Sequence, residues 1–182
     1  MPNTILLATL DALCQHWQAQ SLLPAPDLTA DVVALAKRNG VSLPADFAAL
    51  YQRANGMALT GYQDFDKEGF YFPPVEALRS EPQELLVCSG RGPEGVERVT
   101  TTLTMFVDYL HTSWDYGFIP AASGTGYEIG IRASLGEFKI ITSSLATFLN
   151  LYMEDALVLY DYRNPFASPV PKPKGARCKA TV

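Results

Sequence analysis

Residues 43–56 read Leu43-Pro44-Ala45-Asp46-Phe47-Ala48-Ala49-Leu50-Tyr51-Gln52-Arg53-Ala54-Asn55-Gly56, and they predict a short helix with its own start and stop signals. Pro44 suits the first helical position, where its missing N–H costs no hydrogen bond. Gly56 can adopt the positive φ at which helices often end. Between them an apolar stripe has the i, i+3, i+4, i+7 spacing of one helix face: Phe47, Leu50, Tyr51 and Ala54. We expect this stripe in the core, where burying Phe47 or Leu50 contributes about 1.5–3 kcal/mol each.

Two further helices are predicted before this one. Residues 4–20 carry an amphipathic stripe that we expect to be buried, with the tryptophan as a core residue: Leu6, Leu10, Leu13 and Trp17. Residues 30–39 predict a second helix, capped by Thr29 and stopped by Gly40, with three apolar side chains facing inward: Val32, Val33 and Ala36. The first third of the chain is therefore expected to be helical.

The rest of the chain predicts strands and one closing helix. An aromatic edge strand at residues 69–72 is followed by a helical turn at residues 75–80. Five more runs have strand character: residues 84–88, 101–110, 114–119, 127–131 and 138–141, the last two joined by a hairpin turn at residues 135–137. A helix over residues 143–155, capped by Thr142 or Ser143, has its own apolar stripe: Leu145, Phe148, Leu149 and Tyr152. We therefore expect an α+β fold, with a mixed, mostly antiparallel sheet flanked by N-terminal helices and a closing C-terminal helix.

Composition predicts one globular domain with a tail. The 182 residues are 48% hydrophobic and 18% charged, which is neither disordered nor fibrous. We assign residues 1–163 to one domain and residues 164–182, which contain four prolines, to an extended tail. No apolar run approaches the ~20 residues of a membrane helix, and the first residues lack the basic start and apolar core of a signal peptide. We therefore expect a cytoplasmic protein with no membrane partner.

The charge of the chain is unevenly distributed. The net charge is −5, but residues 164–182 hold four basic and no acidic side chains, so they carry +4. Residues 1–163 hold 10 basic and 19 acidic side chains, so they carry −9. An acidic body repels nucleic acid and anionic membranes and favours a basic protein partner.

Motifs for catalysis, cofactors or metals are weak. Residues 90–95 match G-x-G-x-x-G, but Pro93 and a following β-branched run favour a flexible loop over a nucleotide site. Residues 64–69 open like an EF-hand loop, but Val75 stands where the bidentate glutamate belongs, which favours a solvated acidic loop. The three cysteines and two histidines form no metal-ligand pattern, although a Cys88–His111 nucleophile and base is conceivable. We expect no catalytic residue, no metal and no cofactor.

Residues 108–116 form a stretch in which aromatic and acidic residues alternate. Tyrosine, tryptophan and aspartate together are typical of protein–protein contacts. An equally weighted alternative is that alternate aromatics face the core and the remaining residues form ordinary surface. Combined with the acidic loop, the stretch predicts these partner-binding residues: Asp64, Asp66, Glu68, Asp108, Tyr109, Trp114, Asp115 and Tyr116.

The order of these segments resembles that of a known family. The helix at residues 43–56 is similar to a family motif LP-x-x-[FY]…NG, carried by Leu43, Pro44, Phe47, Leu50, Tyr51, Asn55 and Gly56. The helix before it, a Y-x-I-x-I-like strand at residues 127–131, and the closing strand and helix at residues 138–149 follow in the family's order, with Leu145 where a phenylalanine is usual. Over roughly residues 28–155 the chain thus resembles the SUKH superfamily, which includes bacterial immunity proteins of polymorphic toxin systems and fungal cell-wall-synthesis regulators. Residues 80–112 are longer than expected for this family.

The resemblance implies a non-catalytic binding module. In bacterial members of the family this role is neutralisation of a cognate toxin, often a nuclease, and the acidic body independently suits a basic toxin domain. An alternative is a regulatory or scaffold protein of the same fold that acts through residues 164–182. A third hypothesis, an enzyme, rests only on Cys88, His111 and scattered acidic residues.

Overall fold

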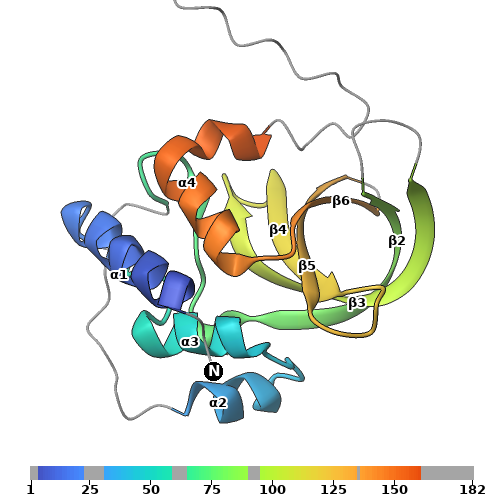
Figure 1. Ribbon diagram of the computed structural model, residues 1–182, viewed down its shortest axis with the longest axis horizontal. Coiled ribbons are helices and arrows are strands. Elements are labelled where there is room, and N and C mark those ends of the chain that lie inside the picture. Colours follow the sequence, from blue (N-terminus) through green and yellow to red (C-terminus); the bar gives the residue numbers. More distant parts are fainter. Residues whose placement is uncertain (1–3, 23–30, 59–64, 90–94, 135, 161–182) are drawn as a thin grey trace, which may run out of the picture.

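The chain folds as an α+β structure in which three helices precede the strands and one helix closes the domain (Figure 1). The computed structural model describes residues 4–22, 31–58, 65–89, 95–134 and 136–160. The helices in these ranges are α1 (Thr4–Ala19), α2 (Val32–Arg38), α3 (Ala45–Arg53) and α4 (Leu145–Tyr160), with a 3₁₀ turn, η1 (Val75–Ala77). The strands are β1 (Phe70–Tyr71), β2 (Arg79–Cys88), β3 (Val96–Tyr109), β4 (Trp114–Pro120), β5 (Tyr127–Ser134) and β6 (Glu137–Thr142). The predicted fold class is confirmed.

The sheet closes on itself. The strand order is β1-β3-β2-β6-β5-β4, and β3 also pairs with β4, so β2 to β6 form a closed ring to which β1 is added (Figure 1). Every pairing is antiparallel except β2 with β6, which run parallel over Leu86 to Cys88. Closure leaves the sheet with an inner and an outer face, and successive residues of a strand point to opposite faces.

The inner face holds a small core of its own, made of five buried residues: Leu85, Val87, Leu103, Ile119 and Phe138. Two glycines, Gly117 and Gly130, pair directly across β4 and β5. A Cβ on Gly130 would lie 2.7 Å from the Phe138 ring, and one on Gly117 would lie 2.7 Å from the Thr104 carbonyl oxygen. A side chain at either position would collide with its neighbours, so the two glycines allow the strands of the closed sheet to pack this closely.

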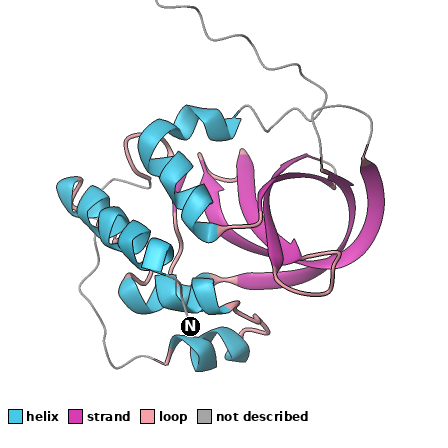
Figure 2. Ribbon diagram, in the orientation of Figure 1, coloured by secondary structure: helices cyan, strands magenta, loops and turns pink. Residues whose placement is uncertain are grey.

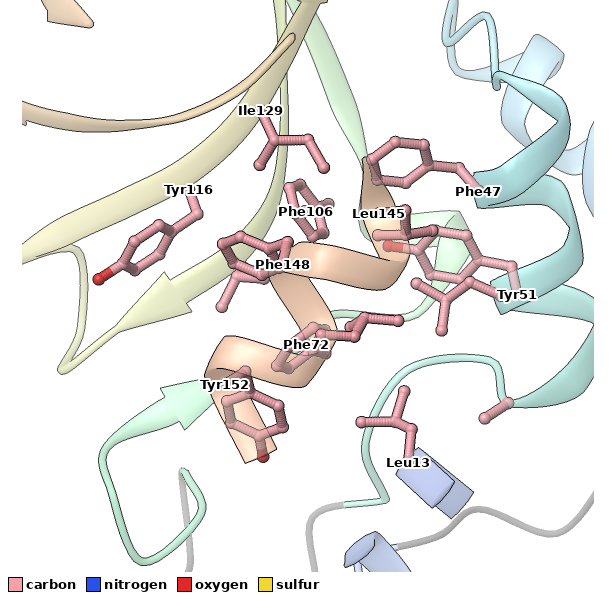
Figure 3. Close-up of a cluster of buried hydrophobic side chains, with 14 of the residues drawn as sticks. Leu13, Phe47, Tyr51, Phe72, Phe106, Tyr116, Ile129, Leu145, Phe148 and Tyr152 are labelled. Atoms are coloured by element: carbon pink, nitrogen blue, oxygen red, sulfur yellow. The ribbon is translucent and has the colours of Figure 1, made fainter. Parts of the chain in front are cut away.

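The outer face of β3, β4 and β5 carries the main core, over which α1, α3 and α4 pack (Figure 2). Phe47 of α3 is fully buried, with its ring centroid 5.0 Å from Phe106, 4.2 Å from Phe118 and 5.2 Å from Tyr127. Figure 3 shows α3, α4 and the strands contributing aromatic side chains to one cluster. The helix that defines the sequence pattern thus attaches the helical layer to the sheet.

The helix at residues 43–56 has the predicted stripe and slightly different ends. Phe47, Leu50, Tyr51 and Ala54 are all buried, as predicted. Pro44 is the N-cap residue rather than the first helical residue, and the helix ends at Arg53. Gly56 has φ +78°, and a Cβ there would lie 2.7 Å from the Phe72 carbonyl oxygen, so its glycine also allows close chain approach.

The other helices confirm the predicted apolar stripes with three corrections. The predicted stripes of α1 and α4 are fully buried, and Trp17 is a core residue. In α2 the cap is Asp31, and Val33 is 48% exposed, because it lies about 100° around the helix from the buried Val32. In α4 the Thr147 amide donates to the Ser144 hydroxyl, so the cap is Ser144 rather than Thr142 or Ser143. Thr29 lies outside the described residues.

Candidate functional site

The structure brings together the two stretches from which a partner-binding surface was predicted. Strand β1 pairs with the end of β3, so that Phe70 lies opposite Tyr109 and Tyr71 opposite Asp108. The Leu110 amide donates to the Gly69 carbonyl oxygen at 3.0 Å. The rings of Phe65 and His111 meet edge to face, with centroids 4.6 Å apart. Residues 65–71 and 108–116 therefore lie side by side at the β3–β4 hairpin.

We call the exposed and half-exposed part of this region the tip surface. Its members combine apolar or aromatic side chains with two carboxylates: Phe65, Glu68, Asp108, Leu110, His111 and Trp114. Leu110 is 41% exposed, one of few large apolar side chains so exposed in the described ranges. Trp114 stacks on Tyr109, with centroids 5.3 Å apart, and this contact fixes its orientation.

The hairpin that carries the tip surface has an unusual backbone. Leu110, His111 and Thr112 have φ values of +46°, +53° and +62°, a left-handed run without glycine. Each such residue costs about 1–2 kcal/mol relative to the right-handed conformation. The run is held by the Thr112 amide, which donates to Asp108 Oδ1 at 2.6 Å, and by the Ser113 amide, which donates to the Tyr109 carbonyl oxygen at 3.0 Å. A strained run held in this way is common at binding surfaces.

Four of the predicted partner-binding residues are buried, which corrects that part of the prediction. Tyr116 is fully buried in the core, and Tyr109 is 8% exposed. Asp115 is also 8% exposed and forms an ion pair with Arg132 at 2.5 Å. Asp66, the fourth, is 7% exposed. The alternative interpretation, in which alternate aromatics face the core, describes Tyr109 and Tyr116 correctly.

Asp66 belongs to an internal hydrogen-bond network rather than to a solvated loop. Its carboxylate accepts hydrogen bonds from the Tyr152 hydroxyl at 2.5 Å and from the Glu68 and Phe70 amides at 2.9 and 2.8 Å. The Trp17 indole N–H donates to the same hydroxyl at 3.2 Å. Burial and the neighbouring Asp66 charge raise the pKa of Tyr152, so its proton stays in this network. Asp66 therefore joins the segment that carries Phe65 and Glu68 to the core.

The predicted residues that remain accessible are Glu68, Asp108 and Trp114, while Asp64 lies outside the described residues. Sequence reasoning missed Phe65, Leu110 and His111 as members of the surface. Phe65 stands inside the predicted acidic loop, and the other two stand inside the predicted stretch. Their exposure depends on the left-handed turn, for which no glycine or asparagine gave a signal.

A second candidate is a groove of about 540 Å³ on the outer face of the sheet. It is lined by the turn before α3 and by residues of β2 to β5 with their connections: Gly40, Ser42, Leu43, Pro44, Ser80, Thr102, Thr104, Phe118, Pro120, Gly126 and Tyr127. Sequence reasoning did not predict this groove, because scattered serines and threonines form no recognisable motif.

The groove is suited to binding rather than to acid–base chemistry. Of the described lining residues, only Tyr127 carries an ionisable group; its hydroxyl donates to Asp46 Oδ2 at 2.7 Å and accepts from the Leu145 amide at 3.2 Å. Burial and the bond to Asp46 raise the pKa of Tyr127, so it remains a neutral phenol. The remaining lining is apolar or hydroxyl-bearing, which offers hydrogen bonds and contact area but no proton transfer.

The weaker motifs gain no support from the geometry. The charged neighbours of Cys88 are Lys139 and Glu137, and burial raises the pKa of its thiol, while the His111 ring meets Phe65 edge to face. Within the described ranges, no three His, Cys, Asp or Glu side chains lie close enough together to hold a metal ion. Residues 90–94 of the glycine-rich motif and residues 164–182 lie outside the described residues.

Neither the scan against protein-family models nor the search of curated proteins gives a match for this chain. Among the described helices, none has both the length and the apolar character needed to cross a membrane. The class that the fold and site define is therefore an α+β domain with a closed mixed sheet, an exposed tip surface and an uncharged groove.

Proposed function

We propose that the chain is a non-catalytic protein-binding module that neutralises a cognate toxin, as immunity proteins of the SUKH superfamily do. The observation that carries the proposal is the tip surface, where exposed Leu110 and His111 and half-exposed Phe65 and Trp114 lie beside two carboxylates. Apolar and aromatic side chains with few rotamers on a fixed turn are typical of binding hot spots. The sequence resemblance supports the toxin-neutralising role, because its motifs follow the family's order over most of the domain.

Charge supports a basic partner. The described residues include 15 acidic and 8 basic side chains, so they carry −7. Four of those bases already form ion pairs, which join Arg53 to Asp11, Arg98 to Glu84, Arg132 to Asp115 and, on the tip surface, Lys67 to Glu68. A toxin that acts on nucleic acid must present a basic surface to phosphates. An acidic binder would be steered to that surface and would cover it.

The proposal is tested with the toxin domain encoded beside this chain. Co-expression is expected to protect cells from that domain, and the two proteins are expected to co-purify. Leu110→Asn removes the apolar side chain and introduces asparagine, which tolerates the positive φ at this position. The variant should weaken binding by about tenfold or more. The matched control is Val96→Asn, because Val96 is 38% exposed at the opposite end of β3 and should leave binding unchanged.

Two outcomes would contradict the proposal. One is absence of both binding and protection with every neighbouring toxin domain. The other is equal loss of binding in the two variants, which would show that the tip surface has no special part. If other proteins co-purify only while residues 164–182 are present, the alternative role of a regulatory or scaffold protein replaces this one.

A further inference from the structure

The groove on the outer face of the sheet has a chemistry distinct from that of the tip surface. Leu43 and Pro44 form one wall, and Phe118, Pro120 and Tyr127 contribute apolar and aromatic area. Hydroxyl groups of the sheet line the rest: Ser80, Thr102 and Thr104. Ser80 and Thr104 hydrogen-bond to each other at 2.6 Å, while Thr102 is exposed at the rim.

The chemistry of this lining favours a ligand with carbonyl acceptors and apolar rings. Hydroxyls at the rim can donate hydrogen bonds to carbonyl oxygens, and prolines with aromatics favour flat apolar rings. Among the described residues that line the groove there is no Asp, Glu, Lys, Arg or His, so a ligand needs no charged group to pair with them. A polyproline-type segment fits, since proline has no backbone N–H to satisfy and its carbonyls are fully available as acceptors.

We propose that the groove binds the chain's own proline-rich segment, residues 168–174, which read Ser-Pro-Val-Pro-Lys-Pro-Lys. This intramolecular contact is independent of the proposed toxin-binding function. Proline fixes its own φ, so prolines at every second position reduce the chain entropy that binding of this segment would cost.

The length of the chain allows the contact. Helix α4 starts at the groove, because the Leu145 amide donates to the Tyr127 hydroxyl in the groove wall. Its 16 residues carry the chain at most about 24 Å away at 1.5 Å per residue. The seven residues 161–167 span roughly 22 Å at 3.1 Å per residue if extended. Residue 168 then falls about 2 Å short of 24 Å, but residues 169–174 add roughly 19 Å at the same rise, so a chain that turns back after α4 can bring the proline-rich segment to the groove.

Charge favours the same contact. Residues 164–182 carry +4, whereas the described residues carry −7. This overall attraction would draw the segment toward the described part of the chain, where its lysines can stay in water while its prolines occupy the groove.

The proposal is tested by disulfide trapping in the full-length chain. A Cys178→Ser background carries Val170→Cys together with Thr102→Cys at the groove rim. The matched control carries Val170→Cys with Thr100→Cys, which is exposed on the same face of β3 two residues outside the groove. We expect the intramolecular disulfide to form at least about tenfold faster at position 102 than at position 100. Alanine at Pro169, Pro171 and Pro173 should remove this preference.

Several outcomes would overturn the proposal. Equal rates at the two positions would mean that the segment samples the surface without docking. A preference that survives the proline-to-alanine changes but disappears in Lys172→Gln/Lys174→Gln would mean that charge alone attracts the tail. A disulfide between two molecules, seen by mass under non-reducing conditions, would assign the groove to a second copy of the chain. As an independent readout, amide NMR shifts at Ser42 and Gly126 should change in the proline variant, and unchanged shifts would refute docking.

Discussion

Replacing Asp66 by alanine tests whether this residue is a buried structural anchor or a solvated acidic residue. The substitution removes the acceptor for three hydrogen-bond donors: the Tyr152 hydroxyl and the amides of Glu68 and Phe70. Because the Asp66 side chain that accepts these bonds is only 7% exposed, water can reach the three donors poorly once the acceptor is lost.

The magnitude follows from the number of donors left unsatisfied. A buried donor without a partner costs about 1–3 kcal/mol, and three of them would together cost about 3–5 kcal/mol after local relaxation. The control is Asp108→Ala. Asp108 is half-exposed and accepts one bond, from the Thr112 amide, so its loss should cost about 0.5–1.5 kcal/mol.

The assay is equilibrium unfolding in urea, with the free energy of unfolding compared among the wild type and the two variants. For a domain of this size, the loss expected for Asp66→Ala corresponds to a fall in Tm of about 6–20 °C. A destabilisation no larger than that of Asp108→Ala would refute the buried network and restore the solvated loop predicted from the sequence.

Three further predictions concern stability. Burial lowers the pKa of His16, so protonation favours the unfolded chain. The free energy of unfolding measured in urea should therefore fall as the pH drops below about 6.5, and His16→Gln should make that fall smaller. Gly130→Ala should cost more than about 2 kcal/mol, because a Cβ there overlaps the Lys139 carbonyl oxygen, whereas Gly40→Ala, with open space but positive φ, should cost about 1 kcal/mol. Thr112→Gly should raise the free energy of unfolding by about 0.5–1 kcal/mol by relieving a positive φ. Comparable losses in the two glycine variants, or no gain at Thr112, would contradict the backbone arguments.

The helices could be predicted largely from apolar spacing. The buried stripes of α1, α3 and α4 follow from the 3.6-residue period, which states directly which side faces the core. The same argument failed at Val33, because in a helix of seven residues the pattern is too short to separate two adjacent valines.

The closed sheet could not be predicted, because closure depends on contacts between distant segments. The start of β2 was missed since residues 79–83 are polar and contain Pro82. This part of β2 pairs only with β3, which is the setting in which a strand tolerates proline. Gly117 and Gly130 permit closure, but in the sequence they have no distinguishing neighbours.

The binding surface was predicted in position but not in composition. Sequence reasoning placed residues 64–68 and 108–116 on one face, and pairing of β1 with β3 does bring the described parts of these stretches together. It could not tell buried Asp66 from exposed Glu68, because both are acidic residues of one loop. The difference arises from Tyr152, which is 86 residues away in the chain.

The central claim, that the tip surface binds a basic toxin domain, is tested most directly by association kinetics with the neighbouring toxin domain. Glu68→Lys reverses an exposed charge on the tip surface, and Glu154→Lys reverses the charge of an exposed side chain on α4. We predict that the wild type binds and that Glu68→Lys slows association several-fold at low salt, while Glu154→Lys changes it much less. Absence of binding by the wild type, or equal slowing by the two reversals, would contradict the claim.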